Sequence, residues 1–288
     1  MGLTMLMGEL RNCVFKIGDY ECWVLHDGSR AIGSMTSGSA NRFIFGDASE
    51  AELEICLRPY GGFNSSTVLP FNYLLVKSDG CFTLLDVGCG DQAKNEEHPD
   101  EPAGLLTRSL NEVGLSVEDI DTVIVSHWHW DHFGGAIADG EVAFPNAEYV
   151  MSMREADYIR AIVKGWALEY LNLIEDRMSL VEGVAEVGSG ITVKNAPGHT
   201  PGIIVAEVSS GVETLLYTSD LIFNRAHLEH IDWIPSFETE RIVSAASRRW
   251  LIEEAYRRKL LLFVPHLSGA LGRVAKGKIG YKWVDEPL

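Results

Sequence analysis

The chain has 288 residues, 46% of them hydrophobic, and its 41 acidic and 24 basic side chains give a formal net charge of −17 at pH 7. A chain of this length and apolar content can bury one large core, and no shift in composition marks a boundary, so we expect one domain over residues 1–288. The negative charge repels phosphate groups and anionic lipid, which argues against nucleic-acid and membrane partners and leaves a small-molecule substrate as the expected partner.

The N-terminus and the cysteines predict a cytoplasmic protein. Residues 1–15 have no basic start followed by a sustained apolar run, and no stretch of about 20 apolar residues is present to cross a bilayer. The five cysteines form no Cys-x-x-Cys pair, and their odd number does not suit a disulfide framework. We therefore expect reduced thiols and no cysteine zinc site.

The N-terminal part of the chain predicts a β-hairpin followed by an irregular segment. Residues 14–17 and 21–25 form the expected strands, and the second strand ends at His26 in a His-Asp-Gly turn. We expect His26 to cap this turn rather than to bind a metal. Residues 29–64 are rich in Gly, Ser and aromatic residues and predict only a short helix near 49–57. This segment is expected to form a flap or an oligomer contact, which leaves a homodimer open.

The rest of the chain alternates between strands and helices, as a mixed α/β protein does. Strands are predicted at 72–77, 82–86, 120–125, 149–151, 190–194, 203–208, 214–218 and 260–264. Helices are predicted at 103–113, within 154–177 and at 239–259. The last helix is expected to bury Ile242, Ala246, Trp250 and Ile252, and its terminal basic residues complement the helix dipole.

The densest group of ligand-type side chains follows a predicted strand, in the run Ser-His-Trp-His-Trp-Asp-His-Phe-Gly-Gly at 126–135. Alternation in an extended turn places His127 and His129 on one side, and Asp131 and His132 follow as the chain bends. Imidazoles and carboxylates are ligands for zinc, iron or manganese, and four of them in six positions exceed the needs of one open catalytic site. We therefore expect two metal ions; the alternative is a polar surface turn.

The pattern His-x-His-x-Asp-His resembles the signature of the metallo-β-lactamase-fold hydrolases. The resemblance continues in the family's order through Ala-Pro-Gly-His-Thr-Pro-Gly at 196–202, Tyr-Thr-Ser-Asp at 217–220 and Val-Pro-His-Leu-Ser at 264–268. The C-terminal run at 266–284 is most similar to the branch of methyl parathion hydrolases and, more distantly, acyl-homoserine lactonases. The resemblance implies an αββα sandwich with a dinuclear metal site at one edge.

The resemblance also implies the metal ligands. One ion would be held by His127, His129 and His199, the other by Asp131, His132 and His266, and Asp220 would bridge both. Asp86 would support the site by accepting a hydrogen bond from the far nitrogen of a ligand imidazole. The two divalent ions are expected to be Zn²⁺, with Fe and Mn as alternatives.

The side chains around this site indicate where a substrate would lie. Candidate pocket residues are Trp130, Phe223, His227 and His230, the two histidines being equally compatible with a place on the surface. The positive charge of two divalent cations exceeds the negative charge of two ligand aspartates and a bridging hydroxide. The centre is therefore positive and attracts a carbonyl or phosphoryl oxygen. The bridging hydroxide would be the nucleophile and Asp131 a catalytic group. A Glu in place of His129 would instead have indicated diiron oxidoreductases.

The predicted reaction is hydrolysis of an ester or lactone. The alternatives are a phosphotriester hydrolase of the methyl parathion type and, in a different class, a non-catalytic metal-binding sensor. Phe223 departs from the lactonase pattern, which places a Tyr three residues after the bridging Asp. Without that hydroxyl, basic alkoxide leaving groups lack assistance and activated aryl leaving groups are favoured. Alternatively, Phe223 is a plain pocket wall, and Asp131 or a metal assists the leaving group.

Overall fold

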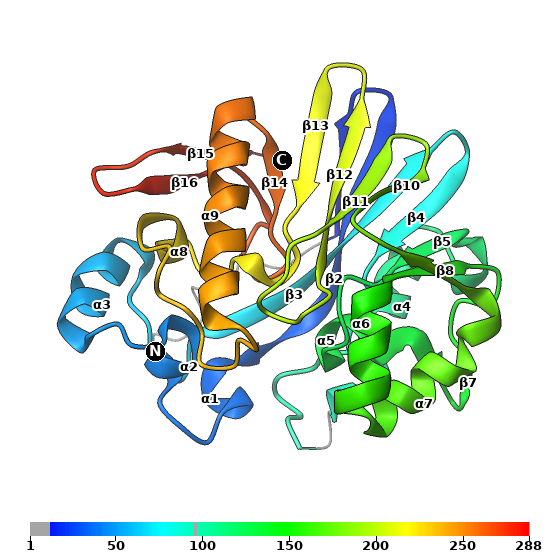
Figure 1. Ribbon diagram of the computed structural model, residues 1–288, viewed down its shortest axis with the longest axis horizontal. Helices are drawn as coiled ribbons and strands as arrows, with labels where there is room; N and C mark the ends of the chain where they lie inside the picture. Colours follow the sequence, from blue (N-terminus) through cyan, green and yellow to red (C-terminus); the bar gives the residue numbers. More distant parts are fainter. Residues whose placement is uncertain (1–11, 95–96, 288) are drawn as a thin grey trace.

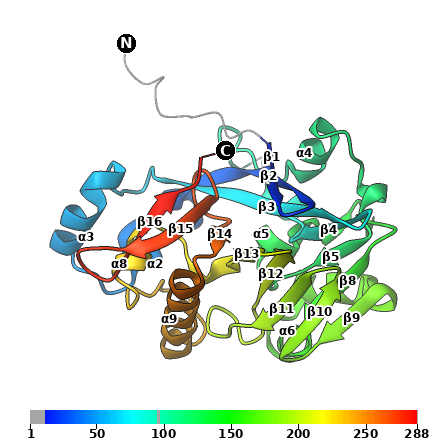
Figure 2. The same ribbon diagram turned by 90° about the horizontal axis from the view of Figure 1, so that it is seen from above.

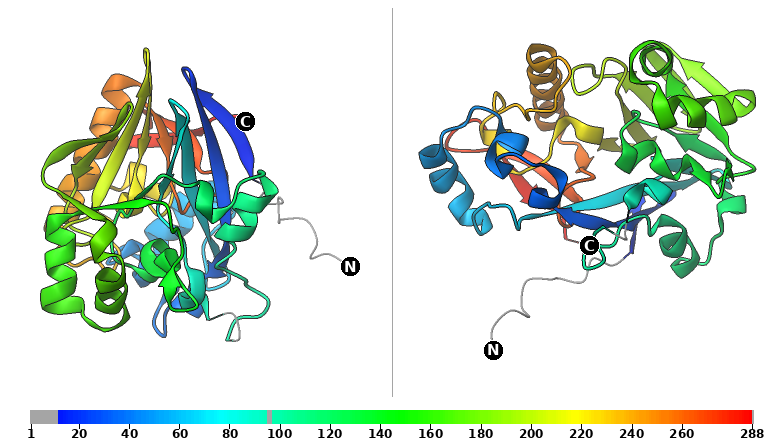
Figure 3. Two further views of the ribbon diagram at one scale, coloured as in Figure 1. Left: turned by 90° about the vertical axis from the view of Figure 1, so that its right-hand side faces the viewer. Right: turned by 90° about the horizontal axis from the view of Figure 1, so that it is seen from below.

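The chain folds into two stacked seven-stranded β-sheets with helices on both outer faces (Figures 1 and 3). This computed structural model describes residues 12–94 and 97–287. In the left view of Figure 3, helix α9 (Arg241–Arg258) covers one outer face and helix α4 (Leu106–Glu112) lies on the opposite one. The predicted αββα sandwich is confirmed.

The N-terminal sheet has the strand order β1-β2-β3-β4-β5-β8-β9. Its strands are β1 (Cys13–Ile17), β2 (Tyr20–Ala31), β3 (Val68–Ser78), β4 (Cys81–Leu85), β5 (Thr122–Ile124), β8 (Glu148–Ser152) and β9 (Met178–Val181). Strands β1 to β4 pair antiparallel, and β4, β5, β8 and β9 pair parallel. The short hairpin of β6 (Ile137–Ala138) and β7 (Glu141–Val142) is separate from both large sheets.

The C-terminal sheet has the strand order β10 to β16. Its strands are β10 (Val184–Gly188), β11 (Ile191–Asn195), β12 (Ile204–Ser210), β13 (Glu213–Tyr217), β14 (Leu261–Phe263), β15 (Leu271–Lys276) and β16 (Tyr281–Asp285). The single parallel pair of this described sheet is β13 with β14, and α9 connects these two strands.

The remaining helices lie around the N-terminal sheet and at the edge where the site forms (Figure 1). They are α1 (Ile32–Met35), α2 (Ala40–Phe45), α3 (Glu50–Leu57), α5 (Trp130–Phe133), α6 (Met153–Tyr158), α7 (Gly165–Leu173) and α8 (Ala226–Glu229). The helix predicted near 49–57 is therefore confirmed as α3, whose N-terminus is closed by a capping box between Ser49 and Glu52.

Alternation along the strands builds the core in three layers. In β3, Leu74 and Val76 point into the space between the sheets, while Tyr73 and Leu75 point to the outer face. All four side chains are fully buried. Each such burial contributes about 1.5–3 kcal/mol. Both faces of this strand are therefore covered, which explains why the run from Tyr73 to Val76 is continuously apolar.

The first hairpin differs from the prediction. Strand β2 does not end at His26 but continues to Ala31, because a β-bulge between His26 and Gly28 keeps the pairing with β3. The ring of His26 lies in the strand, with Nδ1 3.2 Å from Oδ1 of Asn72. The expectation that His26 caps a turn is wrong.

The buried face of α9 also differs from the prediction. Ile252 is buried as expected, but Ile242 is 88% exposed and Ala246 is also exposed. The buried face instead consists of Ser244, Arg248, Leu251, Ile252 and Ala255. The face that carries Arg248 points into the protein because its guanidinium donates hydrogen bonds to three backbone carbonyls. Hydrophobic periodicity does not detect a buried arginine of this kind.

Several strands and helix ends were missed or misplaced. The hairpin β15–β16 and the strands β9 and β10 were not predicted, and α4 begins at Leu106 rather than near Ala103, which instead pairs with Gly28 in an isolated bridge. Within the described ranges, no helix combines the length and the apolar sequence that crossing a bilayer requires.

Candidate metal centre

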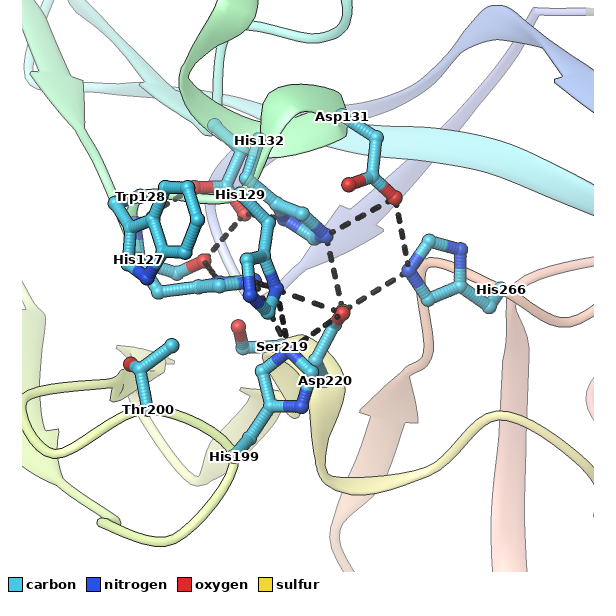
Figure 4. A network of polar contacts seen from close by, with 12 residues as sticks. His127, Trp128, His129, Asp131, His132, His199, Thr200, Ser219, Asp220 and His266 are labelled. Atoms are coloured by element: carbon cyan, nitrogen blue, oxygen red, sulfur yellow. Dashed lines mark hydrogen bonds and ion pairs between the residues drawn. The ribbon is translucent and has the colours of Figure 1, made fainter. Parts of the chain in front are cut away.

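Five loops meet at one edge of the sandwich, and each follows the end of a strand. Asp86 follows β4, the turn at 126–135 follows β5, His199 follows β11, Asp220 follows β13 and His266 follows β14. In each of the parallel pairs β4–β5 and β13–β14, the two strands end at the same edge. Figure 4 shows the side chains from these loops pointing toward one another. Residues up to 180 positions apart in the chain are thereby brought into one site.

The structure brings together all seven side chains that the sequence proposed as ligands. They form two groups, within each of which the ligand atoms lie within 4.8 Å of one another. The first group is His127, His129, His199 and Asp220, and the second is Asp131, His132, Asp220 and His266. All are buried except His129, which is half-buried.

Asp220 lies between the two groups and divides its carboxylate between them. Oδ1 lies 3.0 Å from Nε2 of His132 and 2.9 Å from Nε2 of His266. Oδ2 lies 3.3 Å from Nε2 of His199 and 3.6 Å from Nε2 of His127. This is the arrangement required of a carboxylate that bridges two cations.

The unpaired atoms of the site fit metal ions better than hydrogen bonds. Oδ1 of Asp220 lies 3.0 and 2.9 Å from Nε2 of His132 and His266, yet none of these three buried atoms has a partner in hydrogen-bond geometry among the described residues. In the other group, Nε2 of His199 lies 3.2 Å from Nε2 of His127 and 2.8 Å from Nδ1 of His129. Nitrogen lone pairs crowded in this way repel one another unless a cation or proton lies between them. The donor set fits two divalent metal ions.

The electrostatics of the site favour bound cations. Burial lowers the pKa of His127 and His129 well below the ordinary value, so these imidazoles are neutral, as metal ligands must be. Burial opposes the charge of His199 too, yet the carboxylate of Glu238, followed by that of Asp220, raises its pKa to about 10. Without metal, protons bound to imidazoles such as His199 balance the negative charge of the carboxylates, and metal ions would displace these protons.

Asp86 contacts the second group of donors through the ring of His132. Its Oδ2 lies 2.7 Å from Nδ1 of His132 and accepts a hydrogen bond of 2.6 Å from the Tyr217 hydroxyl. Oδ1 of Asp86 accepts a hydrogen bond of 2.6 Å from the backbone N–H of Ser126, and Oδ2 accepts one of 2.8 Å from the Ser126 hydroxyl. The expected contact between Asp86 and a ligand imidazole is therefore present, and it directs Nε2 of His132 toward Asp220.

Glu155 connects two of the metal-binding loops, and the sequence did not indicate this. Its Oε1 accepts a hydrogen bond of 3.0 Å from the backbone N–H of Trp128, and its Oε2 accepts bonds from the Thr200 hydroxyl at 2.8 Å and the Gly202 N–H at 2.9 Å. The side chain is fully buried, and burial raises its pKa to about 7. In the sequence Glu155 is one acidic residue at the start of a predicted helix, so no signal distinguished it.

Glu238 and Tyr73 are further supports that sequence reasoning missed. Oε1 of Glu238 lies 3.4 Å from Nδ1 of His199, and the buried guanidinium of Arg248 lies 4.0 Å from the same oxygen. The Tyr73 hydroxyl donates a hydrogen bond to the backbone carbonyl of Asp131. The first contact places a negative charge beside one ligand-type imidazole, and the second positions the backbone that carries Asp131.

Two of the four candidate pocket residues line cavities. Phe223 stacks on the ring of His266 at 5.3 Å with an interplanar angle of 9°, and both line a cavity of about 490 Å³, here called the Phe223 cavity. Its apolar walls also include Ile32, Ile44 and Phe63. Trp130 lines a second cavity of about 400 Å³ together with Met35, Phe43 and Trp166.

The other two candidates lie elsewhere. His227 is fully buried behind Phe223, where its Nδ1 accepts a hydrogen bond from the Phe223 N–H and its Nε2 lies 3.2 Å from the carbonyl oxygen of Ile44. His230 stacks on Trp233 at 3.8 Å and lies outside the walls of both cavities. Neither residue lines these two cavities, and the assignment of both to a substrate pocket stays a prediction.

Comparison with known proteins identifies the family. The family description Metallo-beta-lactamase superfamily matches residues 66–264. This chain belongs to the metallo-beta-lactamase superfamily. The metallo-hydrolase is 29% identical over 216 residues to an N-acyl homoserine lactonase from Bacillus sp., a match that covers 67% of this chain and 79% of that protein.

Two solved structures share the fold across nearly the whole chain. AidC, a dizinc quorum-quenching lactonase in complex with the product N-hexanoyl-L-homoserine, superposes with a TM-score of 0.85 at 27% identity, covering 96% of this chain and 98% of that one. The hydrolase AbOPH superposes with a TM-score of 0.84 at 19% identity, with the same two coverages, and supports the fold alone.

Asp220 belongs to both groups of donors, which leads to a prediction about metal binding. Asp220→Asn removes the charge between the two groups and is expected to weaken both ions together, by at least about 10-fold in affinity. His266→Ala is expected to weaken mainly one ion. Elemental analysis and titration with a competing chelator measure both effects. Loss of the same single ion in both variants would show that Asp220 does not bridge.

The Glu155 contacts generate a second prediction. In Glu155→Gln an NH₂ group must face at least one N–H or O–H donor, so the loops carrying His127, His129 and His199 lose their common support. Metal affinity is expected to fall about 10–100-fold. Glu148→Gln, an exposed change on the preceding strand, is the matched control. Wild-type affinity in Glu155→Gln, measured by chelator competition, would contradict the positioning role.

Proposed function

We propose that this metallo-hydrolase cleaves the ester bond of a lactone or of another neutral carboxylic ester. The observation that carries the proposal is the buried carboxylate of Asp220, which lies between two groups of donors, one of which includes His266 in the wall of the Phe223 cavity. The lactonase names of the relatives agree with this substrate class. The net charge of −17 also disfavours strongly anionic substrates.

The seven donors provide the site for the catalytic ions, which we expect to be zinc. When bound, two such ions would supply hydroxide at neutral pH by lowering the pKa of water and would polarise the substrate carbonyl. The protein's part is to keep His127 and His129 neutral and to hold His132 and His199 in position through Asp86 and Glu238. No Ser or Cys nucleophile is required for this chemistry.

The Phe223 cavity provides the place for the substrate. Its wall includes His266, so a carbonyl beside that imidazole would have its apolar part against Phe223, Ile32 and Ile44. The segment 29–64, which contains the helices α1, α2 and α3, supplies several of these walls through Ile32, Ile44, Tyr60 and Phe63. We therefore assign this segment to substrate enclosure, in agreement with its proposed role as a flap.

Asp131 is the residue that we assign to the leaving group. Its Oδ2 lies 3.7 Å from Nε2 of both His132 and His266, and its side chain is buried at the edge of the second donor group. A carboxyl group at this position can carry a proton to the departing alkoxide. Phe223, at the position where the lactonase pattern has a phenol, has no hydroxyl to share this task.

A phosphotriester hydrolase is the second candidate function. The favouring observation is again Phe223, since an aryl phosphotriester releases a phenolate that needs little protonation. Both reactions use the same two groups of donors, and they differ in the leaving group that the site assists.

The proposed function predicts the result of a substrate panel. Protein of measured metal content is assayed on lactones, aryl esters, thioesters and phosphotriesters. Turnover of lactones or carboxylic esters is expected, with its loss on chelation and recovery on metal addition. Turnover of phosphotriesters alone would transfer the assignment to the second candidate. A fully loaded protein inactive on every substrate would contradict an enzymatic role and favour a metal-binding sensor.

The missing phenol predicts a dependence on the leaving group. Phe223→Tyr adds a hydroxyl to a ring that lines the cavity beside His266, so lactone and alkyl-ester rates are expected to rise relative to aryl-ester rates. Phe63→Tyr, in the same cavity but packed against Phe45, is the matched control. An unchanged rate ratio in Phe223→Tyr would mean that Phe223 is only a pocket wall and would leave Asp131 or a metal as the proton source.

A further inference from the structure

A third group of metal-ligand side chains lies away from the catalytic centre, between α3 and α8. It consists of Cys56 in α3, Glu229 at the end of α8 and His230 directly after it. Their ligand atoms lie within 4.8 Å of one another. Figures 1 and 2 show α3 and α8 as neighbours in two perpendicular views. None of these three residues belongs to the groups around Asp220.

We propose that Cys56, Glu229 and His230 bind a third divalent metal ion of the thiolate-preferring class that includes zinc. Sulfur, imidazole nitrogen and carboxylate oxygen are the three ligand types that zinc accepts, and three protein ligands leave one position for water. Zinc bonds of about 2.0–2.3 Å place tetrahedral ligand atoms roughly 3.5 Å apart. The present spacing of at most 4.8 Å therefore has to contract by no more than about 1.3 Å.

The contacts around the group hold two of its members in place. The Tyr60 hydroxyl donates a hydrogen bond of 3.4 Å to Oε1 of Glu229, whereas Oε2 lies 4.0 Å from Sγ of Cys56. The ring of His230 is stacked on Trp233 with an interplanar angle of 4°, which fixes the plane of the imidazole. Supports of this kind orient ligands in metal sites.

The local charges suit a cation. Burial, followed by the charge of Glu229, raises the pKa of the Cys56 thiol to about 11, so the thiol is protonated until a metal displaces its proton. A thiolate and a carboxylate then neutralise a divalent ion. Sequence analysis gave no sign of this site, because Cys56 lies 173 positions from Glu229 and no Cys-x-x-Cys spacing marks it.

An ion at this place would join the segment 29–64 to the chain that follows Asp220. The α8 helix also carries His227, whose ring contacts the backbone of Phe223 and Ile44, and both of these residues line the Phe223 cavity. The third ion would thus act as a structural clamp beside the cavity, separate from the chemistry at Asp220.

Cobalt binding tests the third site without an activity assay. The full-length chain is freed of metal by chelation and titrated with Co²⁺. Three ions per chain are expected, one of them with a thiolate-to-cobalt charge-transfer band, because the centre around Asp220 contains no sulfur ligand. Cys56→Ser is expected to lose this band and to bind two ions. Cys81→Ser, which changes an exposed cysteine, should retain both the band and the third ion.

Two outcomes would overturn the proposal: saturation at two ions without a thiolate band, or a band that persists in Cys56→Ser. If Cys56→Ser does not fold, wild-type protein gives the answer by thiol labelling with peptide mapping. Zn²⁺ is expected to slow the modification of Cys56 while leaving that of Cys81 unchanged. Equal labelling of Cys56 with and without Zn²⁺ would exclude it as a ligand.

Discussion

The position of Asp220 between two groups of buried donors is the constraint on which the rest of the structure depends. Burying a carboxylate and several imidazoles costs several kcal/mol per charge unless opposite charge accompanies them. Burial opposes the charge of Asp220, yet the imidazoles of His132 and His266 hold its pKa well below the ordinary value. Ser219 adopts a left-handed backbone conformation, with φ at +46°, immediately before this carboxylate. The backbone is therefore strained at the residue before Asp220, as is common at functional sites.

The supports of the site come from carboxylates and an arginine that lie deeper in the fold. Asp86, Glu155 and Glu238 each fix a different part of the donor set, and Arg248 brings α9 into the same network. The two β-sheets provide the rigid frame, and the loops beyond their strand ends provide the variable chemistry.

The sequence predicted the parts of the molecule that have local signatures. The six-residue spacing from His127 to His132 and the strand before it were sufficient to locate the turn that supplies four of the seven clustered donors. Of the supports, only Asp86 was expected, from the resemblance; Glu155 could not be predicted, because its role depends on three donors far away in the sequence. The face of α9 was misjudged for a related reason, since a buried arginine with satisfied hydrogen bonds looks like a surface residue in a hydrophobic pattern. His26 looked like a turn residue because a bulge extends its strand.

Anomalous diffraction from metal-loaded crystals, recorded on both sides of the metal absorption edge, tests the central claim most directly. The account predicts two separate peaks at this centre. One should lie among His127, His129 and His199, the other among Asp131, His132 and His266, and Asp220 should be in contact with both. A single peak in a fully active preparation, or two peaks of which only one touches Asp220, would contradict it.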